Sequence, residues 1–446
     1  MRRGTRAAPA LPAPVEVMIE SLTHEGRGVA RVEGKALFVD GALPGERVRA
    51  RYVARHRRYD QAAVDEVLQA SPDRADPRCP HFGVCGGCSL QHMHPEAQIR
   101  AREQAVLEVL EHVGRVRPQR TLEPIVADPW GYRRKARLSA KYVLKKGGAL
   151  VGFRERYSHF LAALEGCEVL HPAVGRRIRA LRDLLTTMDA RDRIPQIEIA
   201  VDDDDQTALV FRNLKPLSPA DRERLESFAR EQGVQVWLQP KGPDTVHPLW
   251  PAEPVPLIYA HPDFDVHIPF GPLDFVQVNR DINRAMVAQA VELLGAGPRD
   301  RVLDLFCGLG NFALPLARRA GHVTGVEGET AMVARARDNA ALNGIANTTF
   351  HAADLAVKDV ADAAWAREAY DAVLLDPPRA GAAGVMDLLG RLRAQRIVYV
   401  SCNPATLARD ADVLVNTHGY DLEAAGVMDM FPHTAHVESM ALFVRR

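Results

Sequence analysis

The sequence lacks the features that mark membrane and secreted proteins. None of its 446 residues belong to an apolar stretch of the roughly 18 residues that a membrane-spanning helix needs. Its start is basic and is followed by alanine and proline rather than by the apolar core of a secretory signal. We therefore expect a cytoplasmic protein whose residues 1–12 form a disordered arm.

Cysteine is scarce and net charge is absent. Six cysteines in a reducing compartment point to a metal site or catalysis before disulfides. The 57 basic and 57 acidic side chains cancel over the whole chain but not locally. Residues 47–58 hold six arginines and no acid, and residues 130–157 hold nine Lys or Arg against Glu155 alone. These blocks indicate a polyanion partner, although each alone also fits a solvated basic face. No membrane and no obligate protein partner is expected.

The first predicted domain, residues 13–74, consists of short alternating segments separated by glycines. Five such segments predict a small closed β-barrel: residues 15–19, 28–32, 36–39, 46–50 and 63–68. The stretches 26–31 and 41–46 resemble the TRAM domain, an OB-like RNA-binding barrel of RNA-modifying enzymes. The resemblance implies that the arginine block follows RNA phosphates; a barrel without a ligand is the alternative.

The predicted central domain, residues 75–270, opens with closely spaced cysteines. Cys79, Cys85 and Cys88 have the spacing C-x5-C-x2-C among glycines, which predicts one metal centre. Zinc prefers paired C-x2-C knuckles, whereas an iron–sulfur cluster accepts a distant fourth ligand, for which Cys167 is available. Spacing alone leaves both metals open.

The rest of this α+β domain contains predicted helices over 97–113 and 174–188 and several strands. The first helix is expected to pack on the domain that follows. Basic strands over 132–138 and 141–144 suit RNA contact, with a plain scaffold role as the alternative.

The last domain, residues 271–446, alternates strand and helix and predicts a Rossmann-like α/β sheet. Its strands are expected at 301–306, 322–327, 371–376 and 396–400. A glycine turn leaves the first strand, and Glu327 lies 19 residues beyond Gly308, where an acid binds ribose hydroxyls. Asp304 before the glycines, and Asp376-Pro377-Pro378 at a later strand end, favour S-adenosylmethionine over a dinucleotide. Asp-Pro-Pro also fits a rigid turn.

Cys402 follows the apolar strand 396–400, at the carboxyl end where open α/β sheets bind ligands. A thiol in this position is a candidate nucleophile. The alternative is a buried cysteine that acts as a small hydrophobe.

Four stretches together resemble the RNA uracil-C5-methyltransferase family: residues 304–312, 376–381, 401–410 and 436–438. The TRAM-like barrel and four cysteines extend the resemblance over nearly the whole chain and point to the large-subunit rRNA branch. It implies methylation of C5 of a uridine in 23S rRNA by S-adenosylmethionine, with another RNA, a tRNA or a different rRNA site, as the alternative. The target base would be flipped out of a loop, because a stacked base does not admit a thiolate to C6.

The resemblance also implies roles for individual residues. Cys402 would be the nucleophile and Glu438 the base, although Glu438 alone reads as a surface carboxylate. A [4Fe-4S] cluster would bind Cys79, Cys85, Cys88 and Cys167. Cofactor contacts would come from Gln277, Phe306, Asn311, Glu327, Asp354 and Asp376, the last of which could instead contact the uracil edge.

Two other functions are compatible with parts of the pattern. An exocyclic-amine methyltransferase would use the Pro-Pro motif and need no thiol. An RNA-binding or chaperone-like protein would carry a decaying methyltransferase domain, which the intact set of Cys402, Glu438 and Asp376 argues against.

Overall fold

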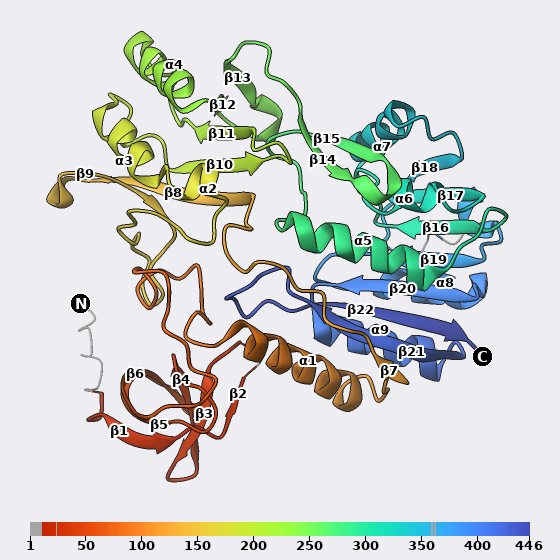
Figure 1. The fold of residues 1–446 in the computed structure, drawn as a ribbon, viewed down its shortest axis with the longest axis horizontal. Helices are drawn as coiled ribbons and strands as arrows, with labels where there is room; N and C mark the ends of the chain where they lie inside the picture. Colours follow the sequence, from red (N-terminus) through yellow and green to blue (C-terminus); the bar gives the residue numbers. More distant parts are fainter. Residues whose placement is uncertain (1–10, 24, 358–359, 361–362) are drawn as a thin grey trace, which may run out of the picture. The chain divides into compact units, whose positions relative to one another are not determined.

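The computed structural model describes residues 11–23, 25–357, 360 and 363–446 (Figure 1). The chain divides into two compact units, the first running to Ala101 and including His433–His436, the second made of Arg102–Pro432 and Val437–Arg446. Residues 1–10 of the predicted arm lie outside the described residues. Within the part described, no helix is long and apolar enough to cross a membrane.

The first unit is built on a six-stranded sheet in the order β1-β5-β6-β4-β3-β2. The main-chain amide of Glu20 donates to the carbonyl of Val29 at 2.8 Å and links the end of the first strand to the third. The sheet curls around one apolar core that includes Ile19, Leu37 and Val48. The first three predicted segments are confirmed within one residue at each end, the last two belong to longer strands, and a two-residue strand, β2, is added. The strands are β1 (Val15–Met18), β2 (Ser21–Leu22), β3 (Gly28–Val32), β4 (Lys35–Asp40), β5 (Arg47–Arg55) and β6 (Tyr59–Gln69).

Helix α1 (Pro95–His112) follows the cysteine-rich loop, two residues earlier than predicted. Its residue Arg102 forms a buried ion pair with Asp429, the two atoms Nη1 and Oδ1 lying 2.6 Å apart. Asp429 directly follows β21 (Tyr420–Met428) of the C-terminal sheet. The ion pair thus joins the second half of this helix to the segment that follows β21.

The second unit begins with a sheet in the order β13-β12-β11-β10-β8-β9. The two predicted basic strands form one strand, β8, because no turn residue separates Leu138 from Lys141. The predicted helix 174–188 is divided into α2 and α3 at Arg176 and Arg177. The elements are β8 (Lys135–Val143), β9 (Gly148–Gly152), α2 (Pro172–Gly175), α3 (Ile178–Thr187), β10 (Gln196–Val201), β11 (Thr207–Arg212), α4 (Pro219–Gln232), β12 (Gln235–Gln239) and β13 (His247–Trp250).

The C-terminal sheet has the order β18-β17-β16-β19-β20-β22-β21-β7. The five neighbouring strands β18, β17, β16, β19 and β20 are parallel to one another, and β22 runs antiparallel to β20. The four predicted strands are confirmed within one residue at each end. Its strands are β7 (Arg120–Thr121), β16 (Arg301–Leu305), β17 (His322–Glu327), β18 (Thr348–Ala352), β19 (Ala372–Leu375), β20 (Arg396–Ser401), β21 and β22 (Glu438–Arg445).

Helices cover this sheet, and a β-hairpin precedes it. Helix α5 crosses β19, β20 and β22 along one face (Figure 1). Strand β19 is buried throughout, and β20 is buried after Arg396; together they are mostly Val, Leu and Ile, as expected for parallel strands covered on both faces. The remaining elements are β14 (Leu257–His261), β15 (Val266–Phe270), α5 (Arg280–Leu294), α6 (Ala313–Ala317), α7 (Thr330–Leu342), α8 (Met386–Leu392) and α9 (Pro404–Asn416).

Candidate active site

The polar residues predicted at strand ends gather at one edge of the C-terminal sheet. Phe306, Asp376 and Cys402 each follow the carboxyl end of a parallel strand. Because β22 is antiparallel to β20, its amino-terminal residue, Glu438, comes to the same edge. In open α/β sheets this edge binds ligands.

Strand pairing brings Cys402 and Glu438 together. Val400 pairs with Met440 and Ser401 with Ser439, so the next step of this register sets Cys402 beside Glu438. The two residues are 36 positions apart in sequence, and only the antiparallel pairing makes them neighbours.

The site is rich in negative charge and partly shielded from water. Burial, followed by the charges of Glu438 and Asp376, raises the pKa of the Cys402 thiol to about 11. Burial and the Asp376 carboxylate raise the pKa of Glu438 to about 8. Burial also raises the pKa of Asp376 to about 7. Three ionisable groups with raised pKa values thus lie close enough to influence one another electrostatically. This pattern is typical of catalytic sites.

Arg379 provides positive charge in this cluster. Its charge opposes the rise in the pKa of both Cys402 and Glu438 but does not cancel it. Its main chain is fixed by the loop that carries the thiol: Asn403 Nδ2 donates to the Arg379 carbonyl at 3.1 Å. The same Asn403 side chain caps α9 by accepting from the Ala405 amide at 3.1 Å, with Pro404 in the first turn. The Asp-Pro-Pro-Arg loop and the cysteine loop are therefore held to each other.

The glycine turn after β16 forms an open cradle. Phe306 has a left-handed backbone with φ of 65°, and its amide is held by the Val326 carbonyl of β17 at 2.9 Å. Gly308 has φ of 53° and no heavy atom within 4 Å of the place where a side chain would begin. Its amide donates to Glu327 Oε2 at 3.1 Å. This space beside an acidic strand end fits the ribose and main-chain contacts of a nucleoside cofactor.

Asn311 faces a polar cluster that the sequence did not predict. It forms a reciprocal pair with Asn283 of α5, each amide nitrogen donating to the other oxygen at 3.0 Å. His261 Nε2 lies 3.0 Å from Asn311 Oδ1. Nothing in the spacing of His261 or Asn283 along the chain could have indicated this contact.

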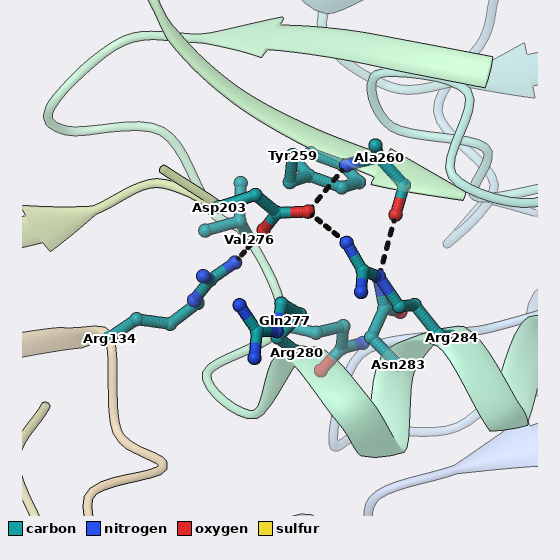
Figure 2. A pocket seen from close by; sticks show the side chains of 9 residues that line it. All are labelled: Arg134, Asp203, Tyr259, Ala260, Val276, Gln277, Arg280, Asn283 and Arg284. Carbon is teal, nitrogen blue, oxygen red and sulfur yellow. Dashed lines mark hydrogen bonds and ion pairs between the residues drawn. The ribbon is translucent and has the colours of Figure 1, made fainter. Parts of the chain in front are cut away.

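Gln277 lies two residues before the cap of α5 and lines a small pocket (Figure 2). The centre of the pocket is the Asp203 carboxylate, which accepts from Arg134, from Arg284 Nη2 at 2.6 Å and from the Ala260 amide at 2.9 Å. Asp203 belongs to the acidic run 202–205 between β10 and β11. It links the central sheet to β14 and α5.

Asp354 follows β18 and is exposed, and its Oδ1 accepts from the Ala356 amide at 2.9 Å. It therefore shapes its own loop. No contact in the described part of the chain joins it to the other predicted cofactor residues.

The predicted metal ligands belong to different units. Cys79, Cys85 and Cys88 lie in the first unit and Cys167 in the second. None of the six cysteines forms a disulfide, and Cys307 is buried behind the glycine turn. The Gly87 amide approaches Cys85 Sγ at 3.4 Å, as amides do around thiolate ligands. Across the described residues, no three His, Cys, Asp or Glu side chains are grouped as metal ligands.

Comparison with known proteins connects this site to a family. Residues 270–446 match the family model tRNA (Uracil-5-)-methyltransferase, and residues 14–59 match the TRAM domain. Over 97% of both proteins the chain is 55% identical to the 23S rRNA (uracil(1939)-C(5))-methyltransferase RlmD of Alkalilimnicola ehrlichii. It is 52% identical to the protein of that name from Methylococcus capsulatus, over 98% of each.

A solved structure shares the fold. The tRNA (uracil-54, C5)-methyltransferase of Pyrococcus abyssi, in complex with S-adenosyl-L-homocysteine, matches with a TM-score of 0.73 and 22% identity. The match covers 96% of this chain and all of that one. This likeness concerns the fold, whereas the high identity to the two bacterial enzymes shows the family. The chain belongs to the RlmD group of RNA (uracil-C5)-methyltransferases.

Proposed function

We propose that the protein methylates C5 of a uridine in 23S rRNA, using S-adenosylmethionine and a covalent bond between Cys402 and the base. The observation that carries this proposal is the meeting of Cys402, Glu438 and Asp376 at the ligand-binding edge of the sheet. The near full-length identity to enzymes named for 23S rRNA supports the substrate.

Cys402 has to overcome the low nucleophilicity of uracil C5. Its sulfur adds to C6, and the electron pair of the C5–C6 double bond moves to make C5 an enolate carbon. The thiol proton must leave before this step, and the Asp376 and Glu438 carboxylates are the nearby acceptors. When bound, S-adenosylmethionine supplies the electrophilic methyl group that C5 takes up.

Glu438 completes the reaction. After methylation C5 carries both a methyl group and a proton, and loss of the proton lets the C6–sulfur bond break and restores the double bond. Because burial and the Asp376 carboxylate raise the pKa of Glu438 to about 8, its carboxylate is a stronger base than an ordinary glutamate. Asp376 would contact the uracil edge or the cofactor.

The cofactor would occupy the cradle after β16. The open space at Gly308 and the Glu327 carboxylate beside it fit a nucleoside. Phe306, Asn311, Gln277 and Asp354 would complete the contacts. The TRAM-type barrel and the basic strand β8 would hold the RNA around a flipped uridine.

We also infer that Cys79, Cys85, Cys88 and Cys167 hold a [4Fe-4S] cluster. Four thiols without disulfides suit iron or zinc, and the Gly87 amide near Cys85 Sγ supports a thiolate there. The cluster would have a structural role or help to position RNA, because methyl transfer involves no electron transfer.

Purification without oxygen tests the cluster. We expect a brown protein with about four iron atoms per chain, and loss of iron and colour in Cys85→Ser and Cys167→Ser. Cys307→Ser is the matched control and should keep the iron. A colourless, zinc-loaded protein would contradict the inference.

Mapping of 5-methyluridine tests the substrate. Ribosomal and transfer RNA from cells with and without the gene should differ at one uridine of 23S rRNA. A difference in transfer RNA alone would instead assign the activity to the alternative substrate.

A further inference from the structure

A buried imidazole holds the amide of Asn311. His261, the last residue of β14, is 2% exposed, and its Nε2 lies 3.0 Å from Asn311 Oδ1. The Asn283 amide of α5 approaches the same oxygen at 3.0 Å and accepts from Asn311 Nδ2 at the same distance. A strand, a helix and the cofactor loop therefore meet at one carboxamide.

Hydrogen-bonding capacity assigns the role of each atom. The Asn311 oxygen can only accept, so His261 must donate to it from Nε2. His261 Nδ1 then carries the lone pair, and among the described residues it has no hydrogen-bond partner. Burial lowers the pKa of His261 to about 4, and Arg284 acts in the same direction; the hydrogen bond to Asn311 and the charges of Asp203 and Asp263 act against it. The ring is thus neutral at physiological pH.

One donor of Asn311 is left for a ligand. Its oxygen receives two hydrogen bonds, and one Nδ2 hydrogen goes to Asn283 Oδ1. Within the described part of the chain, no further protein contact uses the second Nδ2 hydrogen. Rotation of the amide by half a turn would exchange this donor for the oxygen and would break the bonds to both partners.

We propose that His261 is a positioning residue that, through Asn311 Oδ1, fixes the amide so that Nδ2 donates to an acceptor atom of the bound cofactor. This inference rests on the proposed function, because it takes S-adenosylmethionine as the ligand of the loop. It assigns a task to a residue of the hairpin that precedes the catalytic sheet. A histidine that only filled space would not need its Nε2 hydrogen.

Binding of S-adenosylhomocysteine, measured by calorimetry on the full chain, tests the assignment without turnover. Asn311→Ala should weaken binding about tenfold, as expected for one lost hydrogen bond. His261→Phe keeps the ring but not the donor and should weaken binding to a similar extent. His261→Gln keeps an amide donor and should bind within about threefold of the wild type.

The double variant His261→Phe/Asn311→Ala is the decisive comparison. If His261 acts through Asn311, the double variant binds no more weakly than Asn311→Ala alone. Losses that multiply would overturn the proposal, as would a His261→Phe protein with a lower melting temperature and unchanged affinity.

A second route avoids the buried ring. Asn283→Asp removes a donor to Asn311 Oδ1 without changing size and should weaken binding about as much as His261→Phe; unchanged affinity would count against the proposal. If the wild-type protein itself fails to bind S-adenosylhomocysteine, the proposed function falls and this inference with it. If instead the wild type binds and the variants bind equally well, only this inference falls and the proposed function stands.

Discussion

The two units treat buried glutamates in opposite ways. In the barrel unit, Glu46 is fully buried, yet its carboxylate accepts from the Leu43 amide at 2.8 Å, from the Ser71 amide and from Arg74. Although burial opposes the change, hydrogen bonds from Arg74 and from these amides lower the pKa of Glu46. In the catalytic sheet, burial and Asp376 raise the pKa of Glu438 to about 8.

This difference distinguishes a glutamate that stabilises the fold from one that is suited to proton transfer. Hydrogen bonds from its partners stabilise the charged form of Glu46, so this side chain stabilises the fold and stays ionised at neutral pH. Glu438 is buried beside Asp376, and Arg379 compensates only in part, so its pKa of about 8 lies near neutral pH, where the carboxyl can both hold and release a proton. The same residue type is therefore neutralised by hydrogen bonds in one unit, and in the other has the raised pKa that the proposed role as a base requires.

The largest expected effect is that of Cys402→Ala. Loss of the nucleophile should reduce methyl transfer to unmodified 23S rRNA by about 10⁴-fold or more, measured with a labelled methyl group. Cys307→Ala is the control, because that thiol is buried and not in the reaction, and its activity should stay near wild type. Full activity of Cys402→Ala would instead favour an exocyclic-amine methyltransferase.

Replacing the base should stop the reaction at a later point. Glu438→Gln should lower turnover by about 10³-fold, and methylated RNA should remain attached to Cys402, visible as a slow band on a denaturing gel. Glu46→Gln should show no such band. Attachment in neither variant, with turnover lost in Glu438→Gln, would contradict the role of Glu438 as base.

The barrel glutamate should matter for stability alone. Glu46→Gln leaves Arg74 without its charged partner and should lower the free energy of unfolding of that unit by roughly 3 kcal/mol. Denaturant unfolding measures this loss. Methyl transfer per folded molecule should change little, and a loss of activity without a loss of stability would erase the contrast between the two glutamates.

The two glutamates should also give opposite pH dependence. The folded pKa of Glu438, about 8, lies above its unfolded value near 4.5, so its contribution to stability falls as pH rises through this window. Glu438→Gln should therefore be more stable than wild type at pH 9, by about 2 kcal/mol, and similar to it at pH 4. The lowered pKa of Glu46 acts in reverse, because its contribution is present above pH 4.5 and is lost in acid. Thermal unfolding at both pH values checks the sign.

Much of the catalytic sheet could be predicted because periodicity and strand ends are local features. The strand before Cys402 and the turn at Gly308 were both visible in the sequence. The neighbourhood of Cys402 and Glu438 was not, since it depends on a pairing between strands 36 residues apart, and only the family resemblance indicated it. His261 and Asp203 were missed because a buried polar residue is defined by partners far away in sequence. The division of the predicted helix 174–188 into α2 and α3 also had no clear local signal.

The pairing of Ser401 with Ser439 has a consequence for how the chain can change. Successive residues of a strand face opposite sides of a sheet, so a slip of β22 by one position would replace Glu438 by Val437 or Ser439 at the site. The loops between α9, β21 and β22 are not constrained in this way. Insertions of an even or an odd number of residues in these loops are compatible with methyl transfer, provided that β20, β21 and β22 keep their pairing.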